Sequence, residues 1–381
     1  MRFPEFSGEW EKIRLGDNCN ILMCKRIMAA QTNTDCGVPF YKIGTIGGKA
    51  DAYISKELFD EYKMKYSFPR KGEVMITCAG TVGKCIIYNG EDSYYQDSNI
   101  VWIDNPNKVI TNGFLYHSLC KVNWSYLNST TIVRIYNDDL RNLKLYIPHL
   151  DEQKKIARLL SLLDERIATQ NKVIEDLKKL KSAIIEEHYK QSEKQSVPVA
   201  DLGEPFSVSN LSKDDLTDTG TPCVIYGELF TTYGEIINHV ESYTKRSKGM
   251  TLSKKGDLLF PSSTTVDAVS LIAPSNINVD NVILGGDMFG IHISSNYDAQ
   301  YLSYYFNHIA KKQLAKYAKG STIIHLHYKD IEKANLLLPC LIEQNKIAHN
   351  LILLDEKIHN ENAYLQLIVK QKQYMLRHMF I

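Results

Sequence analysis

The sequence lacks several features that define common classes of protein. It has no run of 18 apolar residues, which is the minimum for a membrane-spanning helix, and no secretory signal at its start. We therefore expect a cytoplasmic protein. It has neither a GxxxxGK[ST] phosphate loop nor a GxGxxG loop after a strand, which argues against a P-loop ATPase and a Rossmann-type cofactor site. The net charge of only +1 neither demands nor excludes a nucleic acid partner.

Cysteine pairs with metal-binding spacing are also missing. The eight cysteines form no CxxC motif, and six of them lie in the first half of the chain. This distribution predicts reduced, mostly buried thiols and no disulfide framework. The eight are Cys19, Cys24, Cys36, Cys78, Cys85, Cys120, Cys223 and Cys340.

What the sequence does contain is a duplication of most of its own length. Residues 148–189 and 339–380 align without a gap and share 16 identities in 42 positions. Shorter matches elsewhere, such as Lys71-Gly72-Glu73 with Lys255-Gly256-Asp257, keep an offset between 183 and 191. A repeat of this length predicts a two-lobed molecule with internal pseudo-two-fold symmetry.

The best-conserved repeat segments are predicted to be long helices. Each begins at a proline followed by acidic residues, which favour a helix N-terminus. Apolar residues recur at 4-3 spacing over about 40 residues, or roughly 60 Å of helix, as in a coiled coil. Two ordinary amphipathic core helices are the alternative. The predicted seam residues are Ile156, Leu160, Leu163, Ile167, Ile174, Leu177, Ile347, Leu351, Leu354, Ile358, Leu365 and Ile368.

The remaining regions are predicted to be mixed α/β domains. Strands are expected at 73–77, 257–260, 132–136 and 323–327, and helices at 114–126 and 301–317. The polar stretch 190–197 is taken as the boundary between the halves. The predicted division is a first domain at 1–147, a conserved helix and linker at 148–195, a second domain at 196–338, and a C-terminal conserved helix at 339–381.

The search for catalytic or metal-binding motifs gives little. The glycine loop at 79–84 could present backbone N–H groups to a phosphate, but a tight turn between strands explains it better. The corresponding loop at 263–267 has no glycine, so divergent recognition loops fit the pair. His325 and His327 could form a metal pair, but Arg134 and Tyr136 in the first copy could not. We therefore predict no catalytic residue and no metal site.

The order of domain, Pro-x-x-x-Glu-Gln helix, domain, Pro-x-x-x-Glu-Gln helix resembles the specificity (S) subunit of Type I restriction–modification systems. The resemblance spans the chain and is carried by residues 147–157 with 162–164, by the second copy at 338–355, and by the opening segment 10–17. Asn345 and Cys340 depart from the usual pattern, where a lysine and a second proline are common.

The resemblance implies an α/β, mixed α+β fold with two target recognition domains separated by two long antiparallel coiled-coil helices. Each domain would recognise half of a bipartite, asymmetric DNA target. Two methyltransferase (modification) subunits would dock on the helices, and two restriction (translocase–nuclease) subunits would join them. The partners would use S-adenosylmethionine, ATP and Mg²⁺, and this chain would bind no cofactor and catalyse nothing.

DNA recognition needs donors and acceptors for base edges and cations for phosphates. Two alternatives stay open: the recognition part of a split or truncated single-chain nuclease–methyltransferase, and a coiled-coil scaffold with two lobes that do not bind DNA. The candidate DNA-binding residues are Lys25, Arg26, Thr81, Lys84, Gln96, Asn99, Arg134, Tyr136, Lys245, Arg246, Ser263, Thr264, His325 and His327.

Overall fold

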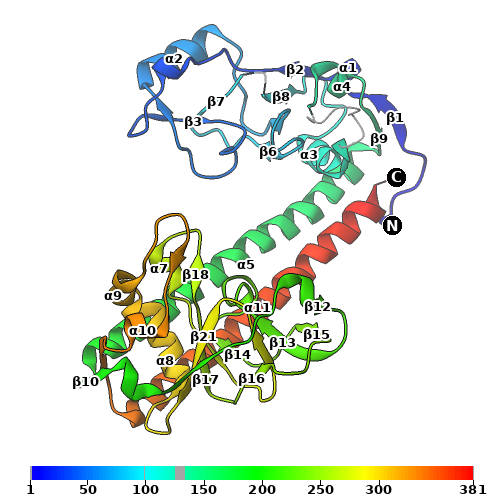
Figure 1. Ribbon diagram of the computed structural model, residues 1–381. Helices are drawn as coiled ribbons and strands as arrows, with labels where there is room; N and C mark the ends of the chain where they lie inside the picture. The colour runs from blue at the N-terminus through cyan, green and yellow to red at the C-terminus, as the bar shows by residue number, and fades with distance from the viewer. Residues whose placement is uncertain (1, 98, 125–133, 381) are drawn as a thin grey trace. The chain divides into compact units, whose positions relative to one another are not determined.

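The computed structural model describes residues 2–97, 99–124 and 134–380. The chain divides into two compact units, unit 1 (Met1–Asn171 with Ala363–Ile381) and unit 2 (Lys172–Asn362). Each unit contains a mixed α/β domain and one part of each of two long helices, α5 (Leu150–Gln191) and α11 (Leu341–Met379), shown in green and red in Figure 1. Both helices therefore belong to both units.

The domain of unit 1 is built on a four-stranded sheet with the order β2-β8-β5-β6 and a three-stranded sheet with the order β4-β3-β7. The central strands β5 and β8 are almost wholly buried, so their near-continuous apolar sequences suit this position. The strands are β1 (Glu11–Arg14), β2 (Asn20–Leu22), β3 (Val38–Tyr41), β4 (Tyr53–Ile54), β5 (Val74–Thr77), β6 (Cys85–Ile87), β7 (Tyr94–Tyr95), β8 (Ile100–Asp104) and β9 (Lys144–Ile147). The helices are α1 (Leu15–Asn18), α2 (Lys56–Lys65), α3 (Asn112–Lys121) and α4 (Asn137–Arg141).

The domain of unit 2 repeats the main sheet, with the order β11-β21-β17-β19 extended by an edge strand, β14; its second sheet has the order β12-β15-β13-β20-β16. The first strands are β10 (Gln195–Pro198), β11 (Gly203–Ser207), β12 (Leu216–Thr217), β13 (Thr221–Ile225), β14 (Ile236–Ile237), β15 (Ser242–Thr244) and β16 (Thr251–Leu252). They are followed by β17 (Asp257–Pro261), β18 (Ser263–Thr264), β19 (Ser275–Ile277), β20 (Ile283–Gly285), β21 (Met288–Ile293), β22 (Ile324–His325) and β23 (Asn335–Leu338). The helices are α6 (Glu228–Thr231), α7 (Ala268–Leu271), α8 (Ala299–Tyr305), α9 (Lys311–Leu314) and α10 (Tyr328–Ile331).

Each domain is closed by pairing its first strand with its last. In unit 1, β1 runs antiparallel to β9, with Glu11 opposite Ile147. In unit 2, β10 runs antiparallel to β23, with Gln195 opposite Leu338. The stretch 190–197 is therefore not a free linker: it holds the end of α5, three connecting residues and most of β10.

Every predicted seam position of the two helices is buried or half-buried, as expected both for a coiled coil and for amphipathic core helices. Within unit 1, Lys372 pairs with Asp164 and the Arg166 guanidinium lies 5.1 Å from the Tyr364 ring, so residue numbers rise along α5 as they fall along α11. The helices are therefore antiparallel. None of the helices in the described ranges is long and apolar enough to cross a membrane.

The other predicted elements are mostly present. The predicted helix 301–317 is α8, a π-helical turn at Phe306–Ala310, α9 and a 3₁₀ turn at Ala315–Tyr317. The strand predicted at 132–136 was wrong for residues 134–136, which are irregular because the chain there turns into α4. Residues 132 and 133 fall within 125–133, which lie outside the described residues. In the second copy, the strand predicted at 323–327 is shortened to β22. Leu326 is buried and both neighbouring histidines are exposed, as predicted.

Candidate nucleic-acid interface

Three loops of the first domain meet at one edge because the backbone of Cys78 joins them. The Cys78 N–H donates to the Asn99 carbonyl at 2.7 Å, and the Cys78 carbonyl accepts from the Ile135 N–H at 2.9 Å. The turn after β5, the segment before β8 and the segment before α4 are thereby held together. We call residues 79–84, 96–99 and 134–137 the first edge, of which the structure describes all but residue 98.

The second domain repeats this arrangement with Ser262 in place of Cys78. The Ser262 N–H donates to the Asp287 carbonyl at 2.7 Å, and the Ser262 carbonyl accepts from the Leu326 N–H at 2.9 Å. We call residues 263–267, 285–287 and 325–327 the second edge. The two edges share a backbone framework, so their differences lie in the side chains that they carry.

The outermost candidates sit on matching helix caps. The Tyr136 N–H donates to Asp139 Oδ2 at 2.7 Å, and the His327 N–H donates to Asp330 Oδ2 at 3.0 Å. These bonds hold Tyr136, which is 64% exposed, and His327 at the first turns of α4 and α10. The same backbone position therefore presents a phenol in one domain and an imidazole in the other.

Each cap residue has a neighbour two positions earlier that lies beside it. The Arg134 guanidinium is 5.8 Å from the Tyr136 ring centroid. The His325 and His327 rings stack with centroids 6.1 Å apart. Each edge thus carries a matched pair of groups that can donate to or stack on a ligand, and all four are exposed except the half-buried Arg134.

Several first-domain candidates lie around one cavity but are already engaged. Arg26, Gln96 and Asn99 line a cavity of about 320 Å³. Arg26 Nε donates to Asp97 Oδ2 at 2.8 Å, and Gln96 Oε1 accepts from the Ile43 N–H at 3.4 Å. A base or phosphate that binds Arg26 would have to share it with Asp97. Outside this cavity, the exposed Lys25 ammonium lies 5.4 Å from the Tyr66 ring centroid.

The glycine loop at 79–84 is a tight turn between β5 and β6, as the sequence analysis favoured. Gly80 and Gly83 have positive φ angles of 66° and 81°. A Cβ at Gly83 would lie 2.2 Å from a Trp124 ring carbon, so no other residue fits there. Thr81 is exposed in this loop, whereas Lys84 Nζ donates to the Ile46 carbonyl at 2.5 Å and so holds the loop in place.

The second-domain candidates separate into two groups. Ser263 and Thr264 form β18, which pairs with β22 so that Ser263 faces His325. These residues and His327 belong to the second edge, although Ser263 itself is buried. The exposed Lys245 and Arg246 belong to a different loop, where Arg246 Nη1 is 3.3 Å from Asp215 and 3.2 Å from the Asn210 carbonyl.

We did not predict from the sequence that the glutamines of the two Pro-x-x-x-Glu-Gln motifs attach the domains to the long helices. The Gln153 amide is fully buried: its oxygen accepts from the Thr111 N–H at 2.7 Å, and its nitrogen donates to the Pro148 carbonyl at 2.9 Å and the Val109 carbonyl at 3.1 Å. Thr111 caps α3, so one side chain ties the start of α5 to a domain helix. The recurrence of Gln in both motifs was the available signal.

The second glutamine does the same in unit 2. Gln344 Oε1 accepts from the Asp298 N–H at 3.0 Å, and its nitrogen donates to the Pro339 carbonyl at 2.8 Å. Asp298 caps α8, the counterpart of α3. Each domain is thus fixed on its long helix by the same buried amide.

A partly buried ionic cluster in unit 2 was also missed. Lys181 Nζ lies 2.9 Å from Glu235 Oε2 and 2.7 Å from Asp355 Oδ1. His308 Nε2 lies 2.9 Å from Glu235 Oε1, and the Tyr304 hydroxyl donates to Asp355 Oδ2 at 2.6 Å. Glu235 directly precedes the extra strand β14, so the repeat offered no signal for it.

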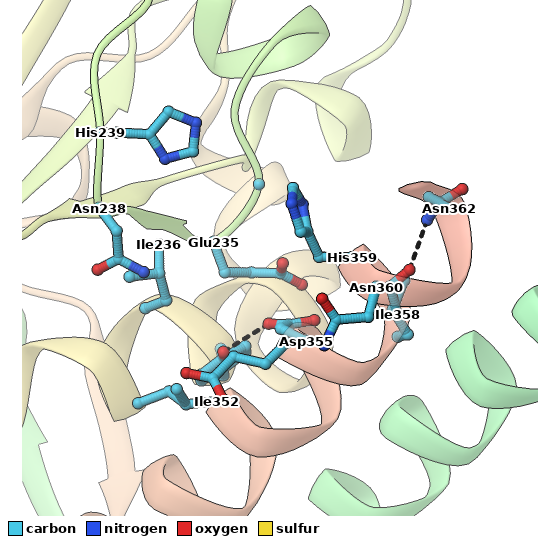
Figure 2. A pocket seen from close by; sticks show the side chains of 13 residues that line it. Glu235, Ile236, Asn238, His239, Ile352, Asp355, Ile358, His359, Asn360 and Asn362 are labelled. Atoms are coloured by element: carbon cyan, nitrogen blue, oxygen red, sulfur yellow. Dashed lines mark hydrogen bonds between the residues drawn. The ribbon is translucent and has the colours of Figure 1, made fainter. Parts of the chain in front are cut away.

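Neighbouring charges decide the protonation state of Glu235. Burial alone would raise its pKa, but the hydrogen bond with His308 and the charge and hydrogen bond of Lys181 outweigh burial and lower the pKa to about 2. Figure 2 shows Glu235 and His239 from the domain and Asp355 and His359 from α11 around a cavity of about 620 Å³. The cluster thus favours the charged form of a carboxylate that lies between the domain and both long helices.

Several predicted seam residues pack in the hydrophobic cores of the two units. Ile156, Leu160 and Leu163 belong to the core of unit 1, and Ile347 and Leu351 to the core of unit 2. A docked protein would meet other faces of the helices. The adjacent leucines of the repeat, Leu162 and Leu353, are 43% and 52% exposed.

Comparison with known proteins gives a consistent result. The family model for the Type I restriction modification DNA specificity domain matches twice, over residues 7–179 and 191–371. A putative type I restriction enzyme specificity subunit of Haemophilus influenzae, S.HindORF215P, is 49% identical over 165 residues, which is 43% of this chain and 42% of that protein. The chain therefore spans less than half of that relative's length in this match. The Type I restriction enzyme MjaVIII specificity subunit of Methanocaldococcus jannaschii is 25% identical over 407 residues, covering 99% of this chain and 92% of that protein.

Solved structures show the same fold at low sequence identity. The S subunit of a Type I restriction–modification system from M. genitalium has a TM-score of 0.64 and 15% identity, with 100% of this chain and 99% of that chain covered. A chain from a study of complex assembly and conformational transition of the type I R-M system has a TM-score of 0.56 and 16% identity, with 98% of each chain covered.

Proposed function

We propose, on the premise that this chain belongs to the Type I restriction–modification specificity (S) subunit family, that each of its two domains recognises one half of a bipartite, asymmetric DNA target. The family membership predicted from the sequence is confirmed. The observation that carries the proposal is the pair of edges, which share a backbone framework and differ in side chains. Identical frameworks with different donors and acceptors suit two readers of two different base sequences.

In this proposal, different side chains contact the bases and the phosphates of the DNA. Thr81, Arg134 and Tyr136 on the first edge, and Thr264, His325 and His327 on the second, offer donors and acceptors for base edges. Lysines and arginines around them would contact phosphates, which position a protein but carry no base sequence information.

The long helices support the docking of two identical partners. Exposed positions on the two helices carry the same or similar residues at an offset of 191: Leu162 and Leu353, Glu165 and Glu356, Arg166 and Lys357. A surface that occurs twice suits one methyltransferase subunit on each copy. Methylation with S-adenosylmethionine, and ATP- and Mg²⁺-dependent translocation and cleavage, would belong to the methyltransferase and restriction subunits.

Exchange of one domain tests the proposed readout. Replacing residues 1–147 with the corresponding region of another family member should change one half of the methylated target and leave the other half intact. The reciprocal exchange of residues 196–338 should change only the other half. Sequencing of methylated adenines in cells carrying each chimera gives both targets. A change in both halves from one exchange would contradict independent readers.

Substitution of the exposed repeat leucines tests the docking surface. Leu162→Asp and Leu353→Asp should each weaken one of two docking sites by at least about 30-fold, because a buried apolar anchor at an interface contributes about 2 kcal/mol or more. Mass photometry with the methyltransferase subunit should show two copies bound to wild type, one to each variant and none to the double variant. The control is Leu180→Asp, since Leu180 is 48% exposed and its repeat counterpart is Gln371. Two copies on the double variant would remove this surface from the proposal.

A further inference from the structure

The motif glutamate of the first copy, Glu152, binds the N-terminal segment of the chain. Arg2 Nε donates to Glu152 Oε1 at 2.7 Å and Arg2 Nη2 donates to Glu152 Oε2 at 2.7 Å. Arg2 Nη1 also donates to the Gly8 carbonyl at 2.6 Å. The Glu152 side chain is only 1% exposed under this contact. A bidentate pair of this kind is among the stronger and more geometrically specific contacts between charged side chains.

The next turn of α5 adds an aromatic contact. Lys155 Nζ lies 4.6 Å from the Phe3 ring centroid and 6.0 Å from that of Phe6, and it pairs with Glu5. A glutamate and a lysine three residues apart therefore bind an arginine followed by aromatic residues. We call this pair of side chains and the surface around it a seat.

Unit 2 carries the same seat without its occupant. Glu343 and Lys346 correspond to Glu152 and Lys155 at the offset of 191. The Glu343 side chain is 40% exposed, and its ionic contact within the described residues is Lys346 at 4.0 Å. Both residues line a cavity of about 550 Å³.

The path of the chain explains why this seat is open. In unit 1, ten residues precede β1, and the described part of that segment can fold back over α5. In unit 2, α5 ends at Gln191 and β10 begins at Gln195, so only three residues join them; these residues border the cavity but include no arginine and no aromatic residue. Lys194, which also lines the cavity, is held away by donating to the carbonyls of Tyr189 at 2.7 Å and Ser192 at 2.6 Å.

We propose that Glu343 and Lys346 form a binding site for an arginine–aromatic segment of a partner protein. The chain itself shows this chemistry on the equivalent residues, where Arg2 occupies Glu152 and Phe3 lies beside Lys155. The site goes beyond the proposed readout of DNA and does not depend on it. A partner held there would contact unit 2 alone, since the equivalent site of unit 1 is filled.

A peptide with the sequence of residues 2–9, labelled at its C-terminal end, is the probe. Fluorescence anisotropy with the full-length chain should show one saturable site. Glu343→Gln should weaken binding at least tenfold, and the control Glu175→Gln should not, since Glu175 is an exposed glutamate of the same unit that also pairs with a lysine but lies outside the cavity. Circular dichroism should show an unchanged fold, because Glu343 is half exposed. An Arg2→Ala chain, with its own seat vacated, should bind two peptides.

Two results would overturn the proposal. The first is absence of saturable binding to the wild-type chain, or binding that Glu343→Gln leaves unchanged. The second is concentration-dependent dimerisation of the wild-type chain that Arg2→Ala abolishes, which would assign the seat to a second copy of this chain.

Discussion

Replacement of Lys181 by methionine is expected to lower the free energy of unfolding of unit 2 by about 2–4 kcal/mol, less than for a fully buried ion pair and more than for an exposed one. Lys181 is the cation between Glu235 and Asp355, so the substitution leaves two nearby carboxylates without it. Hydrogen exchange measured by mass spectrometry on peptides from residues 203–338 should report the loss. The three tryptophans, Trp10, Trp102 and Trp124, all lie in unit 1, so tryptophan fluorescence should change much less.

The pH dependence of unit 2 should show the same cluster. The pKa of Glu235 is lowered to about 2 in the folded chain, compared with an ordinary value of 4.5. Because the folded pKa is the lower one, the stabilisation of about 3 kcal/mol is present above pH 4.5 and is lost as the pH falls toward 2. The stability difference between wild type and Glu235→Gln should therefore shrink over this range.

Lys372→Met is the matched control for the Lys181 substitution. Lys372 occupies the repeat-equivalent position and pairs with Asp164 in unit 1. Lys372 has this one carboxylate partner among its described ion pairs, whereas Lys181 has two, so the loss should be smaller. Equal losses for the two lysines would mean that Glu235 contributes nothing to the cluster.

Replacement of Gln153 by methionine should destabilise unit 1 by about 3 kcal/mol or more. Methionine fills a similar volume but leaves the Thr111 N–H and the Pro148 and Val109 carbonyls without this partner. Each buried polar group without a partner costs about 1–3 kcal/mol. Denaturant unfolding followed by tryptophan fluorescence suits this measurement, because Trp10 and Trp124 pack in the same core as Ile156.

Two other glutamines provide controls for this prediction. Gln344→Met removes two hydrogen bonds in unit 2 and should destabilise that unit with little change in the tryptophan transition. Gln371→Met changes an exposed position on α11 and should alter neither. A tryptophan transition of Gln153→Met that matches wild type would show that the buried amide does not fix the domain on α5.

Local periodicity explains which parts of the fold the sequence could predict. The seam of α5 and α11 follows from 4-3 spacing, since a helix places those positions on one face. The duplication predicted two similar domains, and their main sheets share one strand order. The edge strand β14 has no counterpart among the described residues of the first copy, so the repeat could not predict it or the position of Glu235.

The sequence could not predict which side chains far apart in the chain contact one another. Arg2 and Glu152 are 150 positions apart, and no local pattern joins them. The candidates for DNA contact were chosen by residue type and expected exposure, which cannot show that Lys84 donates to the Ile46 carbonyl or that Arg246 faces Asp215. Thr81, Lys84, Tyr136, His325 and His327 are the exposed candidates on the two edges, and their role in DNA contact stays a prediction.

The pairing of β1 with β9 and of β10 with β23 has a consequence for how new specificities arise. The first and last strands of each domain pair in one two-stranded ladder, whose backbone hydrogen bonds do not depend on side-chain identity. A genetic crossover with both junctions inside these strands would replace everything between them while the ladder and the helices keep their geometry. If the proposed function holds, such an exchange would change one recognised half-site in one step and leave the proposed docking surfaces of the helices unaltered.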